Sequence, residues 1–198
     1  MDAEGFAREY LGALTRAQAA LDVSRVVPIV DALWAAYQAD RQIFICGNGG
    51  SAASASHIVT DLVKGALGHR GDAPARPVRA LSLTDNLPLL SAWANDVGFA
   101  SVFAGQLRPY LVKDDVVVGL SASGNSPNVL NAIRYAREVG ALSIGLSGLG
   151  GGELAALVDL SVVVDSHHYG IVEDVHMQLG HVIAYYFRQR IADELRQA

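Results

Sequence analysis

The chain has 198 residues, of which 51% are hydrophobic and 18% are charged, and its formal net charge is −5 at pH 7. This composition excludes a disordered chain, and the length suits one domain with a sizeable core. The negative charge and the absence of a long Lys/Arg block argue against nucleic acid as a direct partner.

The first residues and the cysteine content indicate a cellular compartment. The single cysteine, Cys46, excludes a disulfide framework within the chain, and its apolar surroundings predict a small buried side chain. The N-terminus lacks the basic start and apolar stretch of a secretion signal, and no apolar run approaches the roughly 18 residues of a membrane span. We therefore expect a soluble cytoplasmic protein with no membrane partner.

The apolar periodicity changes once along the chain. Residues 4–38 have helical spacing with a break near residues 21–27, which predicts an N-terminal helical hairpin. Short apolar strands alternate with helices from residue 42 onward. The predicted strands are 42–46, 78–83, 116–120, 142–146 and 160–164, and the predicted helices are 51–67, 101–112, 127–139, 151–157 and 172–196.

This alternation predicts an α/β fold with a doubly wound, flavodoxin-like, five-stranded parallel sheet and flanking helices. No repeat or linker divides the chain. We expect a single domain over residues 1–198, with helices in 1–40 and an α/β core in 41–198 that ends in a long helix. The composition of residues 68–77 predicts a mobile surface loop.

Two predicted strands are followed by loops rich in Gly, Ser and Asn: CGNGGSAA at 46–53 and LSASGNSPNV at 120–129. In open α/β sheets, ligands bind beyond the carboxyl ends of the strands, and a helix start there offers N–H groups to an anion. The hydroxyls of Ser121, Ser123 and Ser126 would add a phosphate cradle without Lys or Arg.

Gly, Ser and Asn are also common in ordinary turns and helix caps, so either loop alone has a purely structural interpretation. GNGGSA is a poor dinucleotide motif, because the acidic residue expected about 20 residues later is missing, and no P-loop motif is present. Two such loops on one sheet favour a smaller phosphorylated ligand.

Two pairs of ionisable residues are candidates for chemistry. His57 and Asp61 lie four residues apart on one helix face, which suits a metal half-site, a base with its partner, or a solvated pair. Glu173 and His181 lie eight residues apart, about 12 Å along a helix axis. They reach one ligand only by leaning together or from an irregular helix start; otherwise two copies of the chain each supply one. For His176, packing competes with a functional role.

Five segments in this order resemble the sugar isomerase (SIS) domain family and, within it, the phosphoheptose isomerase group. They are CGNGGSAASASH, TDN to NDVGF (84–99), SASGNSPNV, GLSGLGGGELAALVD and EDVHMQLGH. The resemblance implies the SIS fold and a homotetramer with active sites between subunits. It also implies an aldose–ketose isomerase for a phosphorylated sugar, sedoheptulose 7-phosphate in the type members.

The resemblance also assigns roles to residues. The serines Ser121, Ser123 and Ser126 match the family's phosphate-binding residues, the first substrate loop matches Asn48, Gly49, Gly50 and Ser51, and the second matches Asn95 and Asp96. His57 and His181 match two ligands of the family's zinc site, and His181 also matches a catalytic acid/base.

Two positions depart from the type members: Asp61 stands where the family has Glu, and Glu173 where it has Gln. The changes look reciprocal, and a plausible N₂O₂ set for a divalent metal, zinc in this family, remains: His57, Asp61, Glu173 and His181. We expect Asp61 or Glu173 to act as the base that forms a cis-enediol and His181 to shuttle a proton between the oxygens. The alternatives are isomerisation of another phosphosugar and a non-catalytic sugar-phosphate-binding protein, such as a sensor or a partner of a replication initiator.

Overall fold

The computed structural model describes residues 2–67 and 76–197. Within these ranges, five strands form one parallel sheet in the order β2-β1-β3-β4-β5. The strands are β1 (Ile43–Gly47), β2 (Ala80–Ser82), β3 (Val116–Ser121), β4 (Leu142–Ser147) and β5 (Leu160–Val163). The predicted doubly wound sheet is confirmed, and its direction of winding reverses between β1 and β3, where ligands bind in such folds.

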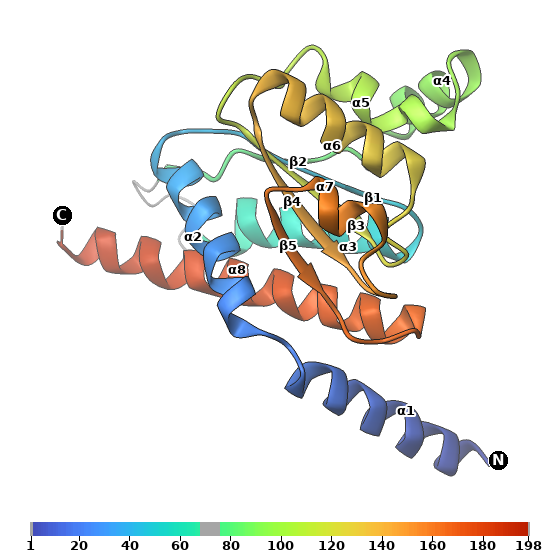
Figure 1. Cartoon of the computed structure of the whole chain (residues 1–198). Helices are drawn as coiled ribbons and strands as arrows, with labels where there is room; N and C mark the ends of the chain where they lie inside the picture. The colour runs from blue at the N-terminus through green and yellow to red at the C-terminus, as the bar shows by residue number, and fades with distance from the viewer. Residues whose placement is uncertain (1, 68–75, 198) are drawn as a thin grey trace.

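Helices cover both faces of this sheet (Figure 1). The helices are α1 (Ala3–Ala19), α2 (Val23–Gln38), α3 (Gly50–Thr60), α4 (Leu87–Asp96), α5 (Val102–Leu107), α6 (Pro127–Val139), α7 (Gly152–Leu157) and α8 (Tyr169–Gln197). One core layer packs α2, α3 and α8 against the sheet, and the other packs α5, α6 and α7 against the opposite face.

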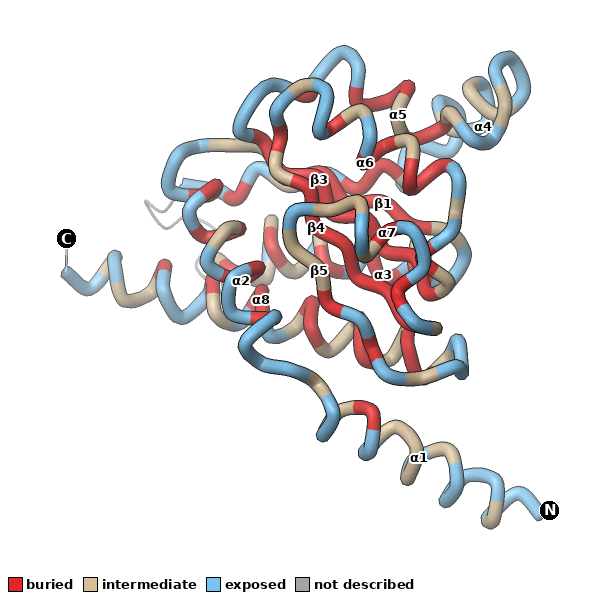
Figure 2. The backbone as a smooth tube through the Cα atoms, in the orientation of Figure 1, coloured by how far each residue is buried: buried red, intermediate tan, exposed pale blue. Residues whose placement is uncertain are grey.

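Strand β1 shows why its sequence is continuously apolar. Ile43 and Ile45 point into the layer of α2, α3 and α8, whereas Phe44 and Cys46 point into the opposite layer. Because successive side chains alternate between faces, a strand covered on both sides buries every residue. Figure 2 shows the buried residues concentrated on the sheet and on the helix faces turned toward it.

The two N-terminal helices are confirmed, but their expected arrangement as a hairpin needs correction. Helix α1 extends away from α2 and lies along the start of α8 (Figure 1). The hydroxyl of Tyr10 donates to Asp174 Oδ2 at 2.7 Å, and Gln18 Nε2 donates to Gln178 Oε1 at 2.9 Å. Apolar residues of α1 also share one core cluster with the start of α8, so both polar and apolar contacts hold α1 against α8 rather than against α2.

Three segments differ from the sequence prediction. The helix predicted over 51–67 changes at Asp61 into a π-helical turn, Asp61–Gly65. Helix α4 was not predicted; it begins at an Asn86 cap that accepts from the Leu89 amide at 3.1 Å, and none of its residues is buried. Helix α8 begins three residues earlier than predicted, at Tyr169.

Residues 68–75 of the predicted surface loop lie outside the described residues. Among the helices that the structure describes, none combines the length and the apolar character that crossing a membrane requires.

Candidate functional site

Helices α3 and α8 approach each other closely because α8 has a glycine at the contact. A Cβ at Gly180 would overlap the side chain of Ile58. His181 follows Gly180, and His57 precedes Ile58, so the close packing brings the two histidines together. Their rings lie 5.3 Å apart between centroids, at an angle of 70°.

These histidines form a cluster with Asp61. The Nε2 atoms of His57 and His181 are 3.4 Å apart, and Asp61 Oδ2 lies 3.4 Å from the first and 3.7 Å from the second. The carboxylate is about three-quarters buried, whereas both rings are about half exposed. Two imidazole nitrogens and one carboxylate oxygen directed to a common point can hold a divalent metal ion.

Glu173 does not join this cluster, although the sequence suggested it as a fourth ligand. Its carboxylate lies against Gly50, the first residue of α3, where a Cβ would overlap both carboxylate oxygens. Glu173 and His181 therefore face different ends of α3: Glu173 faces its start, and His181 faces His57 seven residues later. The separation of about 12 Å along α8 therefore keeps the two side chains apart within one chain.

The serine loop (residues 121–126) joins β3 to the start of α6. Ser121 Oγ donates to Ser126 Oγ at 3.0 Å, and Ser123 Oγ accepts from the Asn125 amide at 3.2 Å. Ser126 occupies the cap position of α6, but its hydroxyl does not cap the helix. Three hydroxyls and a helix start thus gather at the carboxyl end of β3, an arrangement suited to an anion.

A pair of side-chain amides links this loop to the first substrate loop (residues 48–51). Asn48 Nδ2 donates to Asn128 Oδ1 at 2.9 Å, and Asn128 Nδ2 donates back to Asn48 Oδ1 at 2.8 Å. Asn128 is 1% exposed, and the sequence prediction did not include it. Its place directly after Pro127, in the first turn of a helix that follows a candidate phosphate loop, was the available signal.

Known proteins share the sequence and the fold that carry this geometry. The SIS domain family matches residues 7–148 of the chain. The chain belongs to the SIS domain family. Within it, the chain also belongs to the phosphoheptose isomerase group, as its relatives show.

A phosphoheptose isomerase of Nitratidesulfovibrio vulgaris is 41% identical over 72% of this chain and 66% of its own length. A probable phosphoheptose isomerase of Thermoplasma acidophilum is 34% identical over 89% of this chain and 94% of its own length. The solved phosphoheptose isomerase of Neisseria gonorrhoeae superposes with a TM-score of 0.85 at 29% identity, covering 94% of this chain and 98% of that one.

In this SIS chain, Asn95 and Asp96 lie apart from the other candidates. They occupy the end of α4, which packs on α5 on the sheet face opposite α8 (Figure 1). Both are exposed, and Asn95 Nδ2 donates to Asp96 Oδ1 at 2.7 Å. The structure therefore brings together the serine loop and the first substrate loop, but not this third segment.

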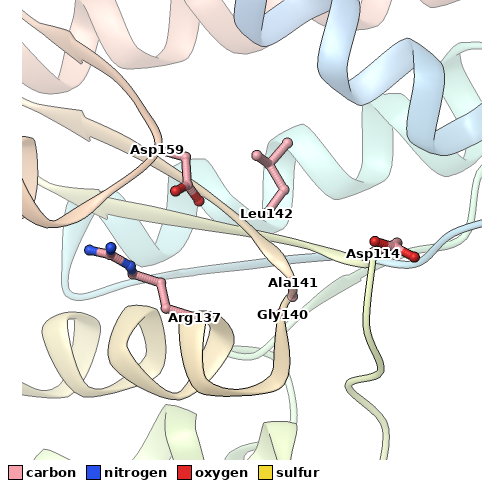
Figure 3. A pocket seen from close by; sticks show the side chains of 6 residues that line it. All are labelled: Asp114, Arg137, Gly140, Ala141, Leu142 and Asp159. Carbon is pink, nitrogen blue, oxygen red and sulfur yellow. The ribbon is translucent and has the colours of Figure 1, made fainter.

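A pocket at the amino-terminal end of the sheet lies apart from the serine loop and the first substrate loop. It has a volume of about 540 Å³ and lies where β4 and β5 begin, beside Leu142 and Asp159 (Figure 3). The Asp159 carboxylate is held by Ser143, whose hydroxyl donates to it at 2.6 Å. None of the predicted site residues lines this pocket.

His176 is fully buried where α8 packs against the end of β4. Its Nε2 lies 3.2 Å from the carbonyl oxygen of Ser147, so Nε2 carries the hydrogen and donates it. The Nδ1 atom of the ring and the hydroxyl of Ser147 are buried without partners among the described residues. Burial lowers the pKa of His176 to about 4, which keeps the ring neutral. Its burial and its neutral ring therefore favour the packing interpretation of His176 over a functional role.

Proposed function

We propose that the chain is an aldose–ketose isomerase that converts sedoheptulose 7-phosphate to D-glycero-D-manno-heptose 7-phosphate. One observation carries the proposal: a serine-rich anion cradle is tied to the loop beside Glu173, whose helix, α8, also contributes His181 to the His/Asp/His cluster. A phosphate holder, a base and an acid/base histidine are the groups that isomerisation of a sugar phosphate requires. The names of the relatives support the same activity.

The serine loop would hold the phosphate through the hydroxyls of Ser121, Ser123 and Ser126. Binding energy gained there would fix the far end of the sugar beside the first substrate loop, formed by Asn48, Gly49, Gly50 and Ser51. The length of the sugar chain would thus decide which carbons lie next to the carboxylate.

Glu173 is the better candidate for the base. Asp61 is engaged with both histidines, whereas the Glu173 carboxylate stands apart from them, against Gly50. In the proposed step, Glu173 takes a proton from C1 of the ketose and returns it to C2, through a cis-enediol. His181 of a neighbouring copy in the proposed tetramer transfers a proton between the oxygens on C1 and C2, which moves the carbonyl to C1.

His57, Asp61 and His181 would hold a divalent metal ion, for which we propose zinc. The donor set fits, because imidazole nitrogen and carboxylate oxygen are common zinc ligands. When bound, the cation would polarise the oxygens of the reacting carbons. The sequence prediction also gave Glu173 as a ligand, and its separation from the cluster favours the catalytic role instead.

We further propose a homotetramer that acts in the cytoplasm, where phosphorylated sugars are metabolised. Exposed apolar side chains support assembly: Phe6 and Leu11 on α1, and Leu87 on α4, are each at least 60% exposed. Solvent contact with large apolar side chains is unfavourable, so burying them against other copies would stabilise the protein. Such assembly would also let Asn95 and Asp96 reach the site of a neighbouring copy.

The test is a direct assay of the purified protein with sedoheptulose 7-phosphate, followed by NMR. Formation of the aldose heptose phosphate, abolished by a chelator and restored by zinc, is the expected result. Glu173→Gln should lower kcat by at least a hundredfold. The matched control is Asp174→Asn, which removes the neighbouring carboxylate that accepts from Tyr10 on α1.

Absence of turnover combined with a raised melting temperature in the presence of the sugar phosphate would replace the enzyme by a binding protein. Turnover of another phosphosugar only would keep the isomerase and change its substrate. Equal losses of kcat in Glu173→Gln and Asp174→Asn would remove Glu173 from the role of base.

A further inference from the structure

We propose that Asn128 is a positioning residue that couples the serine loop to the first substrate loop. Phosphate held in the serine loop would thereby fix the loop that receives the sugar. The inference deepens the proposed function and rests on it for the identity of the ligand. Asn128 would act through Asn48 and would not itself touch the reacting atoms.

The geometry of the pair is fully reciprocal. Each carboxamide donates once to the other and accepts once from it, at 2.9 and 2.8 Å. Asn128 Oδ1 also accepts from the backbone amide of Val129 at 3.0 Å. Two parallel hydrogen bonds between planar groups fix both the separation and the relative orientation of the two side chains. A single hydrogen bond would leave the orientation free.

The two asparagines lie in or next to the two loops that contact the ligand. Asn48 follows β1 directly, and Asn128 lies in the first turn of α6, just beyond the serine loop. Strands β1 and β3 are neighbours, with Gly47 paired to Leu120, so their carboxyl ends are already aligned by the sheet. The amide pair extends this alignment past the strand ends, into the loops themselves.

The last two residues of the first substrate loop belong to α3, whereas the side chain of Asn48 is tied to the serine-loop side of the site only by the amide pair. In the part of the chain that the structure describes, the side chain of Asn48 makes hydrogen bonds to Asn128 alone. The next residue, Gly49, has φ +55°, and a Cβ on it would have no neighbour within 4 Å. Backbone hydrogen bonds from Ala52 and Ala53 hold Gly49 to α3, and the amide pair adds the direct side-chain link to the phosphate cradle.

The coupling predicts different effects on two ligands. Inorganic phosphate contacts the serine loop only, whereas sedoheptulose 7-phosphate also needs the first substrate loop. Loss of the amide pair should therefore spare phosphate affinity and weaken the binding of the sugar phosphate. A residue that only stabilised the fold would change both affinities alike.

The experiment measures the dissociation constants of both probes by calorimetry for the wild-type protein and for Asn128→Leu, which keeps the size of the side chain without its polar atoms. We expect the phosphate constant to stay within about threefold and the sugar-phosphate constant to rise roughly tenfold or more. The matched control is Gln106→Leu. Gln106 is also a buried carboxamide, 4% exposed, and donates to the carbonyl oxygens of Leu83 and Val102 at 3.0 and 2.9 Å.

A second variant keeps the inference testable if Asn128→Leu fails to fold. In Asn128→Asp, the ionised carboxylate cannot donate to Asn48 Oδ1, but the protonated acid can. The ratio of the two dissociation constants should therefore return toward the wild-type ratio as the pH falls. No return, in a variant that folds, would contradict the reciprocal pair.

Equal changes for both probes in Asn128→Leu, no change for either, or the same altered ratio in Gln106→Leu would overturn the coupling. A wild-type protein that binds neither probe would overturn it as well. A wild-type protein that binds the sugar phosphate without turning it over would refute the proposed isomerase. The ratio would still report on Asn128 in that case, so the two failures are distinguishable.

Discussion

Lowering the pH from 7 to 4.5 should destabilise the folded chain by about 2.5 kcal/mol through His176. The ring is 0% exposed, and burial lowers its pKa from 6.5 to about 4. In the unfolded chain the same ring is protonated below pH 6.5. Between these two pKa values, the ring is protonated in the unfolded chain and neutral in the folded chain.

The sign follows from this difference. The contribution of neutral His176 to stability is present above pH 6.5 and is lost as the pH falls toward 4. The full shift corresponds to about 3 kcal/mol, of which the larger part is already lost at pH 4.5. Carboxylates with a lowered pKa, such as Asp22 and Asp193, add their losses at lower pH. Their contribution cancels when two variants are compared.

The assay is denaturant unfolding of chelator-treated protein at pH 7 and pH 4.5, for the wild type and for His176→Gln. Glutamine retains an N–H donor for the Ser147 carbonyl oxygen but does not titrate. The difference in unfolding free energy between the two pH values should be about 2.5 kcal/mol smaller in the variant. The control His167→Gln, at an exposed position, should behave like the wild type. Equal pH dependence in the wild type and His176→Gln would refute the buried neutral ring.

Three further predictions concern two glycines at close helix contacts and the buried Cys46. Gly50→Ala should lower kcat at least tenfold with little change in melting temperature, because its Cβ would displace the Glu173 carboxylate; unaltered kcat would contradict that contact. Gly180→Ala should weaken zinc binding in a calorimetric titration, because it forces α8 away from α3 beside His181; wild-type affinity would show that the close approach is dispensable. Cys46 should resist thiol reagents at neutral pH until the chain unfolds, because burial raises its pKa to about 12. Rapid labelling of the native protein would disprove its burial.

The sheet could be predicted from the sequence because its strands are buried on both faces. Short, continuous apolar runs such as residues 42–46 are typical of such strands, and their alternation with helices leaves few topologies. The position of the serine loop followed from the same rule, since ligands gather at the carboxyl ends of parallel strands. The spacing of His57 and Asp61 was sufficient to place both on one helix face.

The contacts between distant segments could not be predicted. Glu173 faces Gly50, and a glycine carries no side chain whose chemistry would reveal a partner. Asn48 and Asn128 are separated by 80 residues, and each alone is typical of a turn or a helix cap. Helix α4 has no fully buried residue, and its apolar stripe is short, with Leu90, Trp93 and Ala94 only partly buried against the core. Its Asn86 cap and the proline in its first turn were the local signals.

The claim at the centre of this account is that His57, Asp61 and His181 hold the metal ion on which isomerisation depends. The most direct measurement is turnover of sedoheptulose 7-phosphate while chelator-treated protein is titrated with zinc. We predict that the rate rises from near zero to a plateau at one zinc ion per chain, and that His181→Ala shows no such rise. Full turnover by the metal-free protein, or an unchanged titration in His181→Ala, would contradict the claim.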